Sequence, residues 1–258
     1  MKSDFGCCPV VVGGVGGSGT RVVVSILQAL GIFMGSDLNE SLDNMQLARI
    51  FHRLRDRIHT LGPIGTTPDP AAKAEAMHFI RQELGEFIEN MHTAYYAQNV
   101  RRAGWGWKVP GNHFILPYLA EILPRMRYVH VIRHGADMAF SANQNQLRMW
   151  GSHFNIQMDA RAQEQASLAF WIAANRRAVS EARRLGIEFT ILNFNHLCQN
   201  PQEVICGLLG FLSMPADDLA SLAQLVCPPA SLNRHMGRNL DFCGPDERAA
   251  LKELGFDG

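Results

Sequence analysis

The sequence predicts a three-layer α/β fold in which helices cover both faces of a central, mainly parallel sheet. Short β-branched runs alternate with longer amphipathic runs, the pattern of parallel strands joined by crossover helices. A glycine-rich turn separates the first strand from the first helix, as in many phosphate-binding folds. The chain has 258 residues, of which 47% are hydrophobic, and is therefore long enough to bury one sizeable core.

The first hundred residues predict one strand and three helices. The β-branched run at 9–14 is stopped by glycine and predicts a buried strand. The segment 20–31 follows the glycine turn and ends at a glycine, which predicts a helix. The run at 39–59 has apolar residues near helical spacing and predicts an amphipathic helix. After a clear break at 61–70, a long helix is predicted over 71–103.

The middle of the chain continues the alternation. A short aromatic strand is predicted at 104–109, where it is closed by a proline, and a short helix at 115–124 also ends at proline. The run at 127–132 alternates apolar and polar residues and predicts a strand, and a helix is predicted at 135–144. The segment 147–159 lacks clean periodicity and is interpreted as a mobile loop.

The last hundred residues predict a long amphipathic helix at 160–186, a strand at 187–194 and a helix at 200–212 with a proline near its first turn. A final helix is predicted at about 245–254. We expect a single domain over residues 1–258, with a helical insertion at about 39–103.

The composition excludes several classes of protein. Lys and Arg number 24, as do Asp and Glu, so the chain is not built for non-specific binding to nucleic acid or to a membrane surface. No apolar stretch approaches the roughly 20 residues of a membrane span. The six cysteines form no C-x-x-C pair, which favours free thiols over zinc or disulfides. We therefore expect a cytoplasmic protein, and the composition leaves its oligomeric state open.

The glycine-rich turn GGVGGSGTR, residues 13–21, resembles a nucleotide-triphosphate loop with two substitutions. Against the pattern G-x-x-x-x-G-K-S/T, Gly14 and Gly19 fit, but Thr20 replaces the lysine and Arg21 replaces the magnesium-holding hydroxyl. A loop that follows a strand and opens a helix offers free amides and a favourable dipole to an anion. The predicted anion-binding residues are Gly16, Gly17, Ser18, Gly19, Thr20 and Arg21.

A second group of residues lies at the end of a predicted strand. In RYVHVIRHGADMAFS, Arg133 ends the strand and Ser141 follows in the next helix. Both side chains are expected in the crevice at the carboxyl ends of the strands, where ligands bind in open α/β sheets. An arginine can hold a phosphate through two parallel hydrogen bonds.

Taken together, four motifs resemble those of the sulfotransferases that use 3′-phosphoadenosine 5′-phosphosulfate. They are GGSGTR, WGWKVPGNHFILPYLAEILPRMRYVHVIR, VIRHGADMAFS and ILNFNHLCQNPQEVICGLLGFL, and they run from about Val10 to Leu212. The resemblance implies a P-loop NTPase-like fold, a donor 5′-phosphosulfate on the glycine loop, and a 3′-phosphate on Arg133 and Ser141. It also implies transfer of the sulfuryl group to a hydroxyl or amine by in-line displacement without a metal, with adenosine 3′,5′-bisphosphate as the product.

The resemblance also suggests the catalytic groups. The family has a lysine or arginine where this chain has Gly17, and Arg21 and Lys108 are the candidates to supply that charge. A general base is expected some 20 to 30 positions after the loop, where Glu40 and Asp43 lie three apart on the predicted helix. His113, soon after the lysine, is the other candidate for the base. The acceptor is expected to be a small molecule, a glycan or a lipid.

Two other functions remain open from the sequence. GVGGSG also satisfies the dinucleotide pattern G-x-G-x-x-G, with Asp37 at a suitable distance for ribose. An oxidoreductase that uses NAD or NADP would require a strand at 32–36, where GIFMGSD is a poor strand. The replacement of the usual cation by Gly17 would also suit a nucleotide-binding protein without catalysis.

Overall fold

The computed structural model describes residues 8–98, 103–158 and 162–256. Its centre is a sheet of five parallel strands in the order β2-β3-β1-β4-β5. The strands are β1 (Val10–Gly14), β2 (Ile32–Phe33), β3 (Gly104–Lys108), β4 (Arg127–Ile132) and β5 (Glu188–Asn193). Because β3 and β4 flank β1, the glycine-rich turn after β1 lies in the middle of the carboxyl edge of the sheet.

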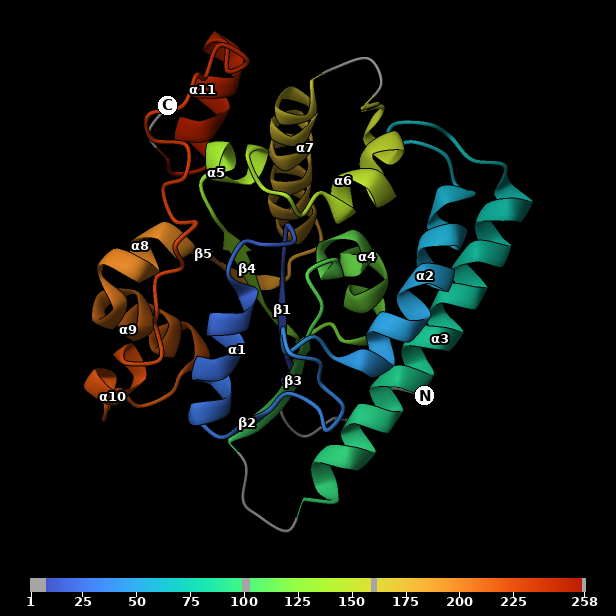
Figure 1. Ribbon diagram of the computed structural model, residues 1–258. Helices are drawn as coiled ribbons and strands as arrows, with labels where there is room; N and C mark the ends of the chain where they lie inside the picture. Colours follow the sequence, from blue (N-terminus) through green and yellow to red (C-terminus); the bar gives the residue numbers. More distant parts are fainter. Residues whose placement is uncertain (1–7, 99–102, 159–161, 257–258) are drawn as a thin grey trace.

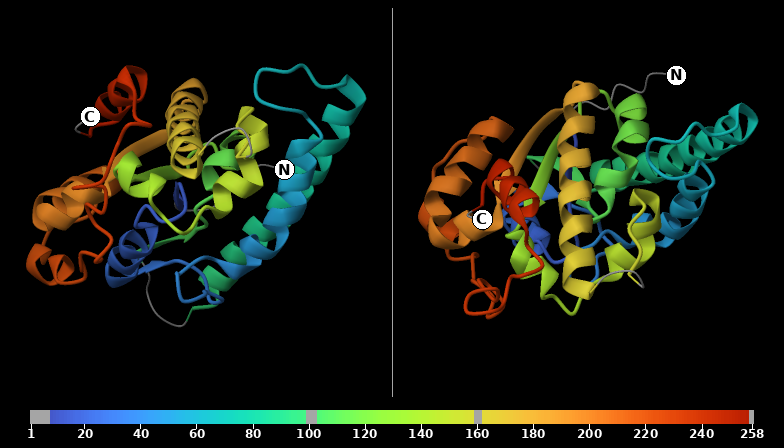
Figure 2. Two further views of the ribbon diagram at one scale, coloured as in Figure 1. Left: turned by 45° about the horizontal axis from the view of Figure 1, so that its top comes forward. Right: turned by 90° about the horizontal axis from the view of Figure 1, so that it is seen from above.

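Helices cover both faces of this sheet (Figures 1 and 2). The chain forms α1 (Thr20–Ala29), α2 (Met45–His59), α3 (Pro70–Tyr96), α4 (Asn112–Ile122), α5 (Gly135–Ala139), α6 (Asn145–Trp150), the 3₁₀ turn η1 (Gly151–Phe154), α7 (Gln163–Arg184), α8 (Phe194–Gln199), α9 (Pro201–Leu212), α10 (Leu219–Ala223) and α11 (Pro245–Glu253). The predicted three-layer P-loop NTPase-like fold is confirmed.

Alternation along β1 separates the core into two clusters. Val11 packs with residues of α2, α3, α4 and α7 on one face, whereas Val10 and Val12 pack with residues of α1, α8 and α9 on the other. Successive side chains of a strand point to opposite faces. All three valines are buried, which explains why the strand reads as a continuous β-branched run.

The helix predicted at 39–59 begins later than expected. It starts at Met45, because the side chain of Asn44 accepts the amide N–H of Leu47 and caps the helix. The preceding segment turns back on itself through a single antiparallel bridge between Leu38 and Asn44. Glu40 and Asp43 therefore do not share a helix face, and that part of the prediction is wrong.

The mobile loop expected at 147–159 is also wrong for most of its length. The chain there forms the end of α6 and then η1. Trp150 is fully buried and stacks on Phe114, with the ring centroids 3.9 Å apart and the planes 11° from parallel. Residue 159, like the predicted helix positions 99–102 and 160–161, lies outside the described residues.

Other boundaries shift by a few residues. The helix predicted at 135–144 stops at Ala139, α4 begins at Asn112, and α8 and α10 were not predicted. The two-residue strand β2 at Ile32–Phe33 was judged unlikely from the sequence, yet it pairs with the start of β3. The region of the expected helical insertion contains α2 and α3, which follow β2 and precede β3 in the chain and lie side by side at one side of the molecule (Figure 1). Among the described helices, none combines the length and apolar character that a membrane span requires.

Candidate functional site

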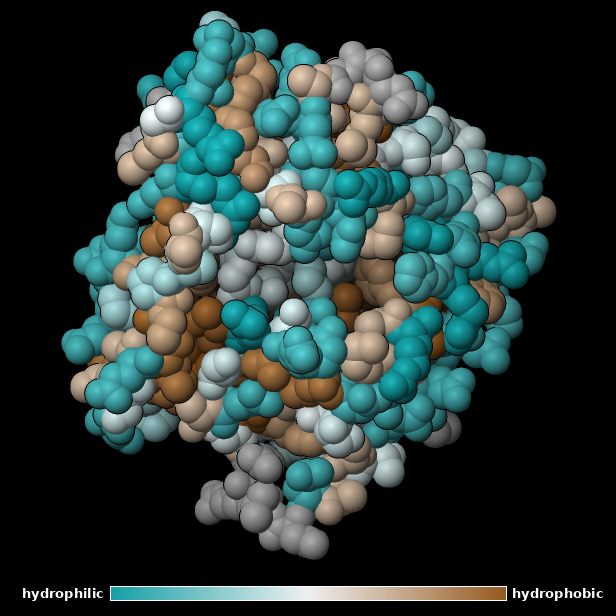
Figure 3. Space-filling model, in the orientation of Figure 1, coloured by the Kyte–Doolittle hydropathy of each residue, from teal (hydrophilic) through white to brown (hydrophobic). Residues whose placement is uncertain are grey.

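A cavity of about 370 Å³ opens at the carboxyl ends of β1, β3 and β4. The glycine loop and α1 form one wall, the segment before α2 forms another, and the chain after α10 closes a third. It is lined by Gly16, Gly17, Gly19, Thr20, Arg21, Val22, Ser41, Asp43, Lys108, Pro110, Arg133, Asn143, Phe194, Cys227, Pro229 and Ser231. The face of the molecule in Figure 3 is hollowed near its centre, above the sheet seen in Figure 1.

The glycine loop has the geometry of an anion cradle. Gly17 and Gly19 have φ values of 96° and 94°, a region that favours glycine. A Cβ at position 19 would lie 2.2 Å from the Phe194 ring. Within the described residues, the amide N–H groups of Gly16, Gly17 and Gly19 form no hydrogen bond, and the buried Ser18 hydroxyl has no partner. These unsatisfied donors at the start of α1 fit a bound phosphate or sulfate.

The position of the missing cation is sterically special. At Gly17 a side chain would have to adopt the left-handed φ of this loop, and its Cβ would lie 3.3 Å from Met138. A lysine placed there would strain the loop as it is built. In this chain the positive charge must therefore come from elsewhere.

Lys108 supplies a charge at the end of β3. Its side chain is 1% exposed, and its Nζ donates to the carbonyl of Ser41 at 2.6 Å and pairs with Oδ1 of Asp43. Burial lowers the pKa of Lys108, Asp43 opposes this effect, and the charge of Arg21 adds to it. Lys108 lies in the wall of the cavity, and its catalytic role stays a prediction.

The turn before α2 carries both candidate acids, Glu40 and Asp43, but places only Asp43 in the cavity wall. Asn39 braces it, because its Oδ1 accepts the amide N–H groups of Ser41 and Asp43 and its Nδ2 donates to Asp43 Oδ2 at 3.2 Å. Asp43 is thereby presented to Lys108 inside the cavity. Glu40 is exposed on the same turn and is not among the cavity-lining residues.

His113, the other candidate base, lies elsewhere. It is fully buried in α4 and is not among the residues that line the cavity. Burial, with the charges of nearby His130 and Arg177, holds its pKa well below the usual value. A histidine without access to the cavity cannot exchange a proton with a substrate bound there.

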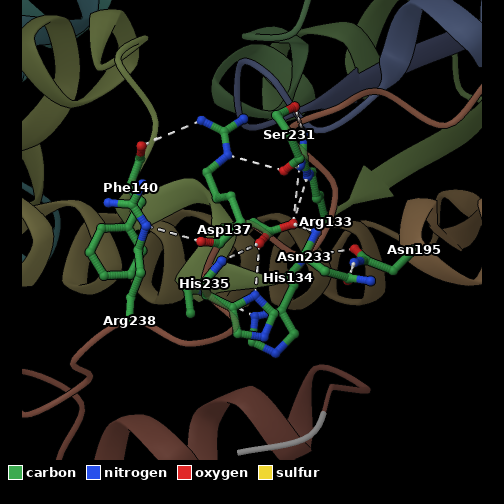
Figure 4. A network of polar contacts seen from close by, with 11 residues as sticks. Arg133, His134, Asp137, Phe140, Asn195, Ser231, Asn233, His235 and Arg238 are labelled. Atoms are coloured by element: carbon green, nitrogen blue, oxygen red, sulfur yellow. Dashed lines mark hydrogen bonds and ion pairs between the residues drawn. The ribbon is translucent and has the colours of Figure 1, made fainter.

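Arg133 lines the cavity just after β4, but its guanidinium is largely occupied (Figure 4). Its Nε and Nη2 donate to Asp137 Oδ2 at 3.2 and 3.0 Å. Nη2 also donates to the Ser231 carbonyl, and Nη1 donates to the Ser231 hydroxyl at 3.3 Å. These bonds use four of the five guanidinium N–H groups. As far as the described residues show, a phosphate would meet one free N–H rather than the two parallel donors that we expected.

Ser141 is not among the residues that line the cavity. It is 7% exposed, and its hydroxyl accepts the amide N–H of Asn143 at 3.2 Å. Asn143 is the residue of this segment that lines the cavity. The sequence also missed Phe194, although its place directly after β5 was a usable signal, and Cys227, Pro229 and Ser231, for which the sequence carried no signal that we recognised.

The cavity carries a net positive charge. Arg21, Lys108 and Arg133 face it, and among the described lining residues Asp43 is the one carboxylate. An anionic ligand would therefore be favoured.

The dinucleotide alternative does not fit this arrangement. In the NAD-binding order 3-2-1-4-5-6, the strand after the first helix lies next to the first strand. Here β3 lies between β1 and β2. Asp37, the proposed ribose partner, pairs instead with Arg49 at 2.8 Å and does not line the cavity.

The fold and the cavity thus define an α/β protein of P-loop NTPase-like architecture, with its glycine loop at the mouth of a cationic pocket. A profile described as the sulfotransferase family matches residues 9–218. The chain belongs to the sulfotransferase family, and the protein is an enzyme of that class, whose chemistry is sulfuryl transfer.

Solved structures of low sequence identity share this fold. The sulfotransferase domain of the Synechococcus olefin synthase has a TM-score of 0.56 at 16% identity, over 97% of this chain and 95% of that one. The sulfotransferase domain of the curacin biosynthetic pathway has a TM-score of 0.51 at 13% identity, over 92% and 82%. A sulfotransferase from Mycobacterium tuberculosis has a TM-score of 0.50 at 14% identity, over 84% and 70%. A search of curated proteins finds no match to this chain.

Proposed function

We propose that this sulfotransferase moves the sulfuryl group of 3′-phosphoadenosine 5′-phosphosulfate to a hydroxyl or amine of a small-molecule, glycan or lipid acceptor. The observation that carries the proposal is the ion pair between buried Lys108 and partly exposed Asp43, which lines one cavity together with a glycine loop that has unsatisfied hydrogen-bond donors. When bound, the donor supplies an activated sulfuryl group on a phosphate leaving group.

The chain offers a set of groups for each part of such a donor. The amides of the loop, with the Ser18 and Thr20 hydroxyls, would hold the 5′-phosphosulfate. The remaining N–H of Arg133 would hold the 3′-phosphate, with Ser141 supporting the Asn143 segment behind it. Phe194, which also contacts the loop at Gly19, forms an apolar wall of the cavity.

Lys108 and Arg21 would stabilise the charge that develops on the leaving oxygen. Fixed cations in a water-poor site act in the transition state without reorganisation. Arg21 is exposed at the first turn of α1, so it can adjust to the ligand, whereas Lys108 is held by two partners. The glycine at position 17 therefore does not leave the reaction without positive charge.

Asp43 is the candidate general base. Its carboxylate lines the cavity with a side chain that is 22% exposed, so an acceptor hydroxyl could reach it. Accepting the acceptor's proton would neutralise Asp43 and free Lys108 to turn toward the departing phosphate. This coupling of proton transfer to charge stabilisation needs no metal ion.

The test measures binding and transfer separately. Isothermal titration of the full chain with adenosine 3′,5′-bisphosphate should give binding that a chelator leaves unchanged, whereas NAD should not bind. A donor labelled in its sulfuryl group should then label members of an acceptor panel. Binding without transfer to any acceptor would favour a nucleotide-binding protein, and chelator-sensitive binding would contradict the metal-free mechanism.

A further inference from the structure

Asp137 is a buried carboxylate that collects five hydrogen bonds. It lies in α5 and is 0% exposed. Oδ2 accepts from Arg133 and from the amide of Asn233 at 2.8 Å, and Oδ1 accepts from the amide and Nδ1 of His235 at 3.2 and 2.7 Å. Burial raises the pKa of Asp137, but the hydrogen bonds from His235 and Arg133 outweigh burial and hold it below the usual value.

Three of these five hydrogen bonds come from Asn233 and His235. Both residues belong to a segment far away in the sequence, residues 231–238, which we call the C-terminal strap. The strap has no helix or strand, and none of its residues is buried. Apart from Leu232, which packs against the core cluster on the α1 side of the sheet, and the stacking of His235 on His134, its position therefore depends on polar contacts. Besides Asp137, its anchors are Asn195, which donates to Asn233 Oδ1 at 3.2 Å, and the carbonyl of Phe140, which accepts from Arg234.

The strap forms part of the cavity wall. Ser231 lines the cavity and binds Arg133 through both its carbonyl and its hydroxyl. Arg133 and the strap thus bind the same carboxylate, as the dashed lines in Figure 4 show. Without Asp137, the guanidinium would lose the partner that fixes its plane, and Ser231 would lose the anchor two residues downstream.

We propose that Asp137 is a positioning residue that locks Arg133 and the C-terminal strap together as the nucleotide-binding wall of the cavity. The role for nucleotide binding rests on the proposed function, whereas the locking of the strap does not. Within the described residues, Asp137 and Ser231 together leave Arg133 a single free N–H, and this N–H sets the direction from which a phosphate is held.

The first test follows the strap without any ligand. Hydrogen exchange of the full chain should show the amides of Asn233 and His235 exchanging at least about tenfold faster in Asp137→Asn than in wild type. The matched control is Asp241→Asn, an exposed carboxylate just beyond the strap that bonds to Asn239, and it should leave these amides unchanged. Unchanged exchange in Asp137→Asn would overturn the locking role.

A second variant covers the case in which Asp137→Asn does not fold. His235→Ala removes one strap donor and keeps the Arg133–Asp137 pair, so it should loosen the strap in a folded chain. It should accelerate exchange across the strap and leave the remainder of the chain protected. Normal exchange in this variant would likewise contradict the proposal.

The third measurement addresses the nucleotide. Asp137→Asn should weaken adenosine 3′,5′-bisphosphate at least about tenfold and adenosine 5′-phosphate less than about threefold. Tighter binding of the bisphosphate by Asp137→Asn would show that Asp137 merely offsets the charge of Arg133. Faster exchange in the strap with unchanged nucleotide affinity would also contradict the positioning role of Asp137. If wild type binds neither nucleotide, the proposed donor fails, and the exchange experiment still decides whether Asp137 holds the strap.

Discussion

Removing the Lys108 ammonium should slow sulfuryl transfer far more than it weakens nucleotide binding. The suitable substitution is Lys108→Met, because the side chain is 1% exposed and its aliphatic stem fills buried space. A single preorganised donor of this kind is worth about 2.7–4 kcal/mol in the transition state, or roughly 100- to 1,000-fold in turnover. We expect the lower end, because Arg21 lines the same cavity and keeps part of the charge.

The assay is steady-state transfer from labelled donor to the best acceptor, with the affinity for adenosine 3′,5′-bisphosphate measured in parallel. Arg21→Ala should lower both turnover and affinity, because Arg21 sits on the helix that carries the loop. Lys73→Met, an exposed lysine in α3, serves as the control for loss of one lysine. Near-normal turnover in both Lys108→Met and Arg21→Ala would refute the reasoning and favour a binding protein.

Three further predictions follow from the structure. Arg133→Ala should weaken adenosine 3′,5′-bisphosphate by about 1.5–3 kcal/mol in titration and leave adenosine 5′-phosphate nearly unchanged; equal losses would remove the 3′-phosphate assignment. Gly19→Ala should lower the free energy of unfolding by at least about 1 kcal/mol, because the φ of Gly19 is 94° and a Cβ there would clash with Phe194. In contrast, Gly85→Ala should raise the free energy of unfolding by about 0.5–1 kcal/mol, because Gly85 lies in the middle of α3 with open space around it. Burial lowers the pKa of His130 to about 4. As the pH falls from 6.5, the ordinary pKa of histidine, toward 4, the unfolded chain takes up the proton first, so the free energy of unfolding should decrease by up to about 3 kcal/mol. If the free energy of unfolding, measured with urea, depends on pH in His130→Asn as it does in wild type, this prediction is contradicted.

The strands and the glycine loop could be predicted because their signals are local. The run of valines in β1 is continuous since both faces of the strand are covered. The positions of Lys108 and Arg133 in the cavity wall could be anticipated because each lies at the carboxyl end of a recognisable strand, whereas their roles stay predictions. Their ordering in one site follows from the parallel sheet, in which all carboxyl ends share an edge.

The missed features depend on tertiary contacts. The helical periodicity of 39–59 extends past the true start at Met45, and what stops the helix is the side-chain cap of Asn44 together with the brace of Asn39. Strand β2 has two residues and exists because β3 offers a partner. Trp150 orders its segment by stacking on Phe114, a contact across 36 positions of the chain that no local pattern reveals.

The arrangement of charge explains how this chain can lack the usual cation in its loop. Each buried cation of the cavity has its own carboxylate, Asp43 for Lys108 and Asp137 for Arg133, because an unpaired buried charge would be strongly destabilising. Within the described residues, exposed Arg21 forms no ion pair, and the amide N–H groups of Gly16, Gly17 and Gly19 form no hydrogen bond. An incoming anion therefore meets Arg21 and the amides first, at little desolvation cost, and competes with a carboxylate only when it engages Lys108. Binding would then depend mainly on the loop and Arg133. Turnover would depend mainly on how easily the ion pair between Asp43 and Lys108 breaks. The variants above should therefore change binding and turnover to different extents.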